Sequence, residues 1–166
     1  MPSSIIAWED FKTFHTDGQV LSKETGFLRS YGQNPYTGYD RIDQPSFLFR
    51  GPTDGRLPAR ERVATVSLGN VDAAFPFFNL EMEKVVNYTV GEQDLVAFFE
   101  AGTTSALDGR FIADSKDIGS TAALDSQVDD QMLAFKIEED VFVDNETGSV
   151  WNLLGGRKPA RWLAPS

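Results

Sequence analysis

Pairs of turn-forming residues divide the second half of the chain at short intervals, and this spacing constrains the fold more than any other feature of the sequence. Gly69-Asn70 separates RVATVSL from VDAAFPF, and Gly91-Glu92 separates VVNYTV from DLVAFFE. Two-residue turns between apolar runs are typical of β-hairpins. Further turns are expected at Asp129-Asp130 and across residues 145–148. The pattern therefore predicts an antiparallel meander over residues 62–155, either as an open sheet or as a small barrel.

The first part of the chain predicts one helix and one long irregular segment. Ser4 can cap a helix over residues 5–15, and residues 79–84 can form a further helical turn. Residues 25–60, which we call the strap, are dense in Gly, Pro, Asn and Asp and follow no regular period. The expected fold is a single mainly β (β-rich α+β) domain over residues 1–166, with one short N-terminal helix and a long irregular aromatic strap.

Composition excludes several classes of function. The chain has 15 Lys and Arg against 25 Asp and Glu, a formal charge of −10, which disfavours nucleic acid as a partner. It has no Cys and a single His, so disulfides, thiolate zinc sites and multi-histidine centres are excluded, and no cofactor or metal is expected. Because no apolar run reaches 18 residues, we expect a soluble chain without membrane insertion. Composition leaves the compartment and the oligomeric state open.

The charges are unevenly placed along the chain. Between Asp125 and Glu146 there are eight acids and only Lys136 as a base. Arginines, in contrast, cluster near the end of the strap, at positions 50, 56, 60 and 62. The distribution indicates one acidic edge and one basic edge, although most charge runs are simply solvated faces.

The strap holds the residues best suited to ligand binding. Tyrosine rings offer rigid amphipathic faces and arginines offer forked donors, a combination that recognises sugars, carboxylates or partner proteins. The alternative is that the tyrosines fasten an irregular segment to the sheet. The ligand-binding candidates are Tyr31, Tyr36, Tyr39, Arg41, Arg50 and Arg56.

Several runs of the sequence resemble, in order, the bacterial and archaeal family called domain of unknown function 3179. They are WEDFK, HTDGQVLSKETGFLRSYGQNPYTGY, GRLPARERV, EKVVNYTVG, GTTSALDGRFIADSKDIGS and DNETGSVWNLLG. Many members carry Cys-Pro-x-Cys after the strand that here reads LVAFFE; residues 100–103 read Glu-Ala-Gly-Thr instead, so thiol or metal chemistry does not transfer. The resemblance implies no established activity. It also implies that this stretch corresponds to the second of two similar modules in longer, often extracytoplasmic proteins.

Three functions stay open at this point. The first is a non-catalytic binding or interaction module, which would bind a small polar molecule or a protein partner. The second is a carboxylate-based hydrolase or isomerase acting on a small polar substrate. Its candidate residues are Glu100, Ser105 and Asp108, which adjoin the position of the family's Cys-Pro-x-Cys. The third is a purely structural half of a two-module protein.

Overall fold

The computed structural model describes residues 3–158, which divide into two compact units. The sheet unit holds residues 3–4, 62–100 and 120–158, and the strap unit holds residues 5–61 and 101–119. The single domain expected from the length of the chain stays a prediction. No helix among the described residues is long and apolar enough to cross a membrane.

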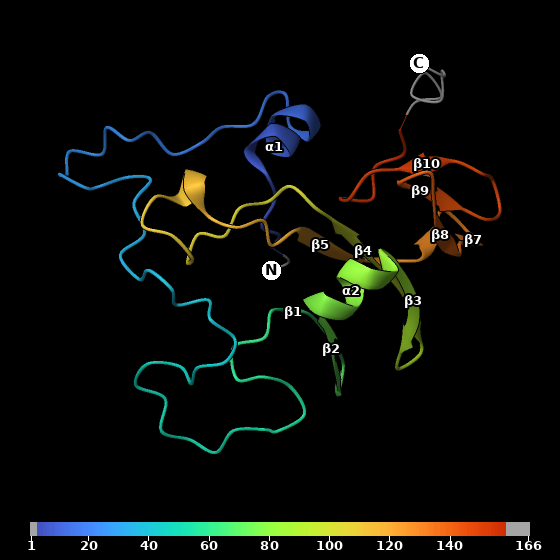
Figure 1. Cartoon of the computed structure of the whole chain (residues 1–166). Helices are drawn as coiled ribbons and strands as arrows, with labels where there is room; N and C mark the ends of the chain where they lie inside the picture. The colour runs from blue at the N-terminus through green and yellow to red at the C-terminus, as the bar shows by residue number, and fades with distance from the viewer. Residues whose placement is uncertain (1–2, 159–166) are drawn as a thin grey trace. The chain divides into compact units, whose positions relative to one another are not determined.

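The sheet unit consists of short antiparallel strands, as the turn spacing predicted (Figure 1). They form four small sheets, in the orders β1-β2, β3-β4-β5, β6-β7 and β10-β9-β8, and none of the sheets in the described residues closes into a barrel. The strands are β1 (Val63–Leu68), β2 (Val71–Pro76), β3 (Val85–Val90), β4 (Gln93–Glu100), β5 (Ser120–Asp125), β6 (Gln127–Val128), β7 (Gln131–Met132), β8 (Phe135–Glu138), β9 (Val141–Asp144) and β10 (Val150–Trp151).

The predicted turns lie where the hairpins reverse. Gly69-Asn70 joins β1 to β2, Gly91-Glu92 joins β3 to β4, and Asp129-Asp130 joins β6 to β7. Gly91 has a φ of 63°, in the left-handed region that glycine enters without steric cost. Residues 145–148 separate β9 from β10, whose strands pair through Val143 and Val150. The hairpin prediction is therefore confirmed.

Both helices differ from the sequence-based bounds. Helix α1 (Trp8–Phe14) is shorter than residues 5–15, and its N-cap is Ala7, without a side-chain cap, so the prediction that Ser4 caps this helix is wrong. Helix α2 (Phe77–Glu83) is a second helix, longer than the single turn expected over residues 79–84. It buries Leu80, which is 1% exposed. Tertiary packing thus stabilises a longer helix than the single turn that the sequence predicted.

Strand β4 forms the centre of the sheet unit because both of its faces are covered. Leu95, Ala97 and Phe99 belong to a cluster that also contains Leu80 of α2. On the opposite face, the Phe98 ring stacks on Phe142 at 4.4 Å and meets Phe135 edge-on at 5.2 Å. The uninterrupted apolar run LVAFF is what a strand buried on both faces requires.

Two polar side chains hold the remaining pieces of the sheet unit. Asn87 on β3 donates to the carbonyl of Phe135 at 2.7 Å and accepts from its N–H at 2.8 Å, so it links β3 to β8 as a neighbouring strand would. Asp144, which is fully buried, accepts hydrogen bonds from Thr147, Ser149 and the indole of Trp151. Burial raises the pKa of Asp144, but these hydrogen bonds outweigh it and leave the pKa below its ordinary value.

The strap unit is held together mainly by polar contacts. The strap contains no helix or strand, in agreement with the prediction, and Figure 1 shows it as a plain trace. Asn34 fixes it to the loop 101–119 by donating to the carbonyl of Gly109 at 3.1 Å, and its own N–H donates to Arg110. Further along, the N–H of Tyr39 donates to Leu107. The buried residues described in this unit are polar, and many of its large apolar side chains are exposed.

Candidate functional site

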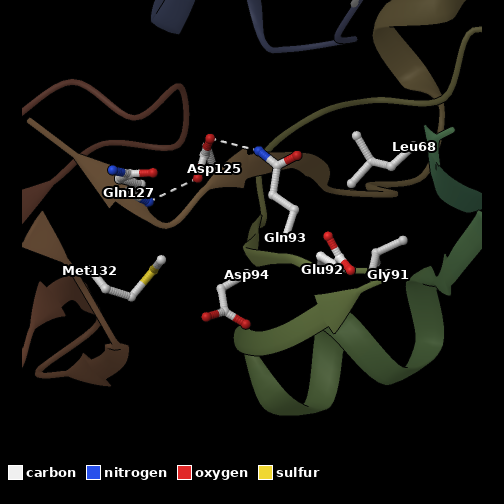
Figure 2. Close-up of a pocket in the computed structure, with 9 residues that line it drawn as sticks. Leu68, Gly91, Glu92, Gln93, Asp94, Asp125, Gln127 and Met132 are labelled. Carbon is white, nitrogen blue, oxygen red and sulfur yellow. Dashed lines mark hydrogen bonds between the residues drawn. The ribbon is translucent and has the colours of Figure 1, made fainter. Parts of the chain in front are cut away.

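A cleft of about 410 Å³ lies in the sheet unit where several strand ends meet. Leu68 ends β1 and Val90 ends β3, and Gly91 and Glu92 of the β3-β4 turn also line the cleft. The other wall comes from the end of β5 and from the short β6-β7 hairpin, through Asp125, Gln127 and Met132 (Figure 2). Its volume falls in the range of clefts that take small molecules or single side chains.

Acidic and amide side chains dominate the polar part of this cleft. The carboxylates belong to Glu92, Asp94 and Asp125, and the amides belong to Gln93 and Gln127. Among residues 3–158, no Lys, Arg or His contributes to its lining. Negative charge inside the cleft is therefore not neutralised by any basic residue of its wall.

Hydrogen bonds position two of the three carboxylates. Gln93 donates its Nε2 to Asp125 Oδ2 at 2.6 Å, and the N–H of Gln127 donates to Asp125 Oδ1 at 2.8 Å, as Figure 2 shows. Asp94 Oδ1 accepts from the hydroxyl of Thr89 at 2.5 Å. The donors of these bonds are neutral amide, backbone and hydroxyl groups, so none of them brings a positive charge to either carboxylate.

The rest of the cleft is apolar. Val90 is 2% exposed and Leu68 is half-buried, whereas Met132 is 47% exposed and presents a flexible thioether. A cleft with an apolar wall and a carboxylate rim suits a cationic group on an aliphatic stem, because the stem packs while the charge stays near the rim.

The net charge of the whole sheet unit also favours a cationic ligand. Its described residues include 14 Asp and Glu but only five Lys and Arg, whereas those of the strap unit include 11 Asp and Glu and nine Lys and Arg. A cleft surrounded by one sign of charge concentrates ions of the opposite sign. No group of three or more His, Cys, Asp or Glu in residues 3–158 is arranged to hold a metal ion.

The ligand-binding candidates all lie in the strap unit, which brings only some of them together. The rings of Tyr36 and Tyr39 are 6.2 Å apart, and Tyr39 lies under the guanidinium of Arg60, 4.3 Å from its ring centre. Tyr31 bonds to Thr25 through its hydroxyl. Arg56 pairs with Asp54 at 2.5 Å. Arg41 and Arg50 are exposed, and among the described residues neither guanidinium forms a cation–π contact with a tyrosine ring.

The catalytic candidates are divided between the units. Glu100 ends β4 in the sheet unit, whereas Ser105 and Asp108 lie in the strap unit. Ser105 is 1% exposed; its hydroxyl donates to Asp40 at 2.6 Å and accepts from the N–H of Leu107 at 3.2 Å. Lys116 connects this pair to Asp108, with its Nζ 3.4 Å from Asp40 and 3.9 Å from Asp108.

Sequence reasoning missed Asp40 and Lys116, and it missed the cleft. Asp40 follows the last tyrosine of the strap, and Lys116 lies 76 positions later, so no local spacing connects them. In the cleft, Glu92 was interpreted only as a turn residue. The available signal was the acidic run that begins at Asp125, which agrees with the predicted acidic edge.

Comparison with known proteins identifies the family. The family model described as "Protein of unknown function (DUF3179)" matches residues 1–162, so the chain belongs to that family, as the resemblance indicated. No curated protein matches the chain, and no solved structure does. The family supplies no activity, and the function has to be argued from the site.

Proposed function

We propose that this member of the family is a non-catalytic binding module whose cleft binds a cationic group carried on an aliphatic stem. The observation that supports this function is the lining of the cleft: three carboxylates and three apolar side chains, with no basic residue among them. The carboxylates supply acceptors for an ammonium or guanidinium group. Leu68, Val90 and Met132 supply the surface on which the stem packs.

A binding role agrees with what the cleft contains. A cationic ligand would add the opposite charge that its wall does not provide, and each contact would be charge-assisted. Asp94 and Asp125 are already oriented by neutral partners, so little side-chain freedom is lost when a ligand binds. The hydrolase or isomerase, ligand binding by the strap and the structural half of a two-module protein stay predictions.

Agmatine is a suitable probe because it carries a guanidinium and an amine on a four-carbon stem. We expect the side-chain amide signals of Gln93 and Gln127 and the methyl signal of Met132 to shift on titration with agmatine by NMR, and not with 1-pentanol. Replacing Asp94 by Asn should weaken binding roughly fivefold, about 1 kcal/mol for one partly exposed charge contact. Added salt should weaken it further.

Glu81→Gln is the matched control, since Glu81 is an exposed acid on α2 outside the cleft. It removes the same charge from the unit and should leave agmatine binding within twofold. Agmatine binding that is absent in the wild type, or equally weakened by Glu81→Gln and Asp94→Asn, would show that the cleft is not the binding site.

A further inference from the structure

The strap contains a turn that presents three consecutive large apolar side chains to solvent. Phe47 and Leu48 are each 74% exposed and Phe49 is 54% exposed. The N–H of Phe49 donates to the carbonyl of Ser46 at 3.1 Å and closes the turn, with Leu48 at a φ of 66°. We call residues 46–50 the tip. An apolar run of this kind on a surface marks a contact site, because leaving it in water is unfavourable.

The tip also carries one positive charge. Arg50 follows Phe49 directly, and it is the only charged residue between Asp43 and Asp54. It is exposed and has no ion pair within residues 3–158. The tip is therefore apolar and cationic, with no acid in the segment to neutralise it.

The apolar side chains and the positive charge of the tip are complementary to the cleft. The cleft offers an apolar wall and acidic side chains without a basic residue, and the tip offers apolar side chains and an arginine without an acidic residue. A volume of about 410 Å³ accommodates a few side chains of a turn, but not a folded element. Phenylalanine and arginine are also enriched at protein interfaces relative to the rest of the surface.

We propose that the tip of one chain occupies the cleft of a second copy of this chain. Arg50 then lies against the carboxylates of Glu92 and Asp94, while the apolar side chains of the tip pack on the wall. This inference rests on the proposed function, because it names the cationic group that the cleft binds. Tip and cleft are different surfaces, so the contact is heterologous, and association can continue beyond a dimer unless a ring closes.

Sedimentation equilibrium over a range of chain concentrations tests the proposal. The average mass of the wild type should rise with concentration. Arg50→Glu should raise the dissociation constant at least about tenfold, since it places like charges together. The double variant Glu92→Lys/Asp94→Lys should do the same. A mixture of the two variants should associate again, because the acidic tip of one now meets the basic cleft of the other.

Phe47→Ser tests the apolar part of the contact, and Phe27→Ser is its control. Phe27 is also in the strap and is 72% exposed, but it lies outside the tip. Only the tip variant should weaken association. Both side chains are exposed, so both variants should unfold at the same temperature as the wild type. If Phe47→Ser unfolds at a lower temperature, Phe47→Leu replaces it, and this variant should weaken association less than Phe47→Ser does.

Several results would overturn the proposal. One is a mass that does not change with concentration, and another is a charge-swapped mixture that fails to associate. Sedimentation of the chain with phosphatidylserine vesicles that requires Phe47 would assign the tip to a lipid surface instead. If agmatine still binds in the cleft while the chain stays monomeric, the self-association fails and the binding function stands. If agmatine does not bind, the binding function itself fails.

Discussion

Replacing Asp144 by Asn should destabilise the sheet unit by an amount that the hydrogen bonds of this residue define. Oδ1 accepts from the N–H and the hydroxyl of Thr147, and Oδ2 accepts from the N–H of Ser149 at 3.1 Å and from the indole of Trp151 at 2.9 Å. Asparagine has one oxygen and one NH₂ group in these places. The hydroxyl of Thr147 also reaches Oδ2, at 2.7 Å. If the NH₂ takes the place of Oδ1, the N–H of Thr147 meets another donor; if it takes the place of Oδ2, the N–H of Ser149 and the indole do. At least one donor therefore loses its acceptor in either orientation.

The magnitude follows from that count. A buried donor left without an acceptor costs about 1–3 kcal/mol, so the loss of at least one acceptor should destabilise the unit by about 1–3 kcal/mol. Asp144 is 0% exposed and Trp151 is 5% exposed, so water cannot replace an acceptor that the indole loses. Urea unfolding followed by circular dichroism measures the change. Asp140→Asn is the control, because Asp140 is exposed at a φ of 61°, which asparagine tolerates.

The loss of stability caused by Asp144→Asn should also depend on pH. The pKa of Asp144 is lowered in the folded chain, so its stabilising contribution is fully present above the ordinary carboxyl pKa and is lost as pH falls through the lowered value. The difference between wild type and Asp144→Asn should therefore be largest at neutral pH and shrink as the pH falls below the ordinary carboxyl pKa. A difference below about 0.5 kcal/mol at pH 7, or one that stays constant with pH, would refute the assigned role.

Two further substitutions test the packing of the sheet unit by the same urea assay. Asn87→Ala should lower the free energy of unfolding by about 2 kcal/mol because it leaves both backbone groups of Phe135 without their partner. Thr89→Ala, a control on the same strand, should lower it less. Equal losses of stability would contradict the link between β3 and β8. Phe98→Ala should lower the free energy of unfolding by about 3–5 kcal/mol because it opens a cavity between two aromatic rings. Phe98→Leu should recover much of this stability. A loss below about 1 kcal/mol for Phe98→Ala would contradict the central place of Phe98 in the core.

The hairpins were the most predictable part of the fold because their signals are local. Gly69-Asn70 and Gly91-Glu92 specify a reversal through their own backbone preferences, and the apolar runs on each side need only pair with their neighbour. Helix α2 was less predictable, since a seven-residue helix owes its stability to burying Leu80 rather than to its own sequence.

The candidate sites were less predictable than the hairpins. The tyrosines drew attention because aromatic side chains in a loop are unusual, yet Asn34 and Asp40 are the buried residues of the strap, at 5% and 6% exposure. Burial of a polar residue depends on the partner that satisfies it. Those partners, Gly109 and Ser105, come from a loop more than 60 positions away.

The sequence by itself determined the hairpin meander, the irregular strap, the family and the acidic balance of the chain. Each of these depends on composition, on order along the chain or on backbone preferences within a few residues. The tertiary structure alone decided the cleft, because Leu68, the β3-β4 turn and Met132 become neighbours only when the strands pack together. It also decided which apolar side chains stay exposed at the tip, since exposure depends on what the rest of the chain covers.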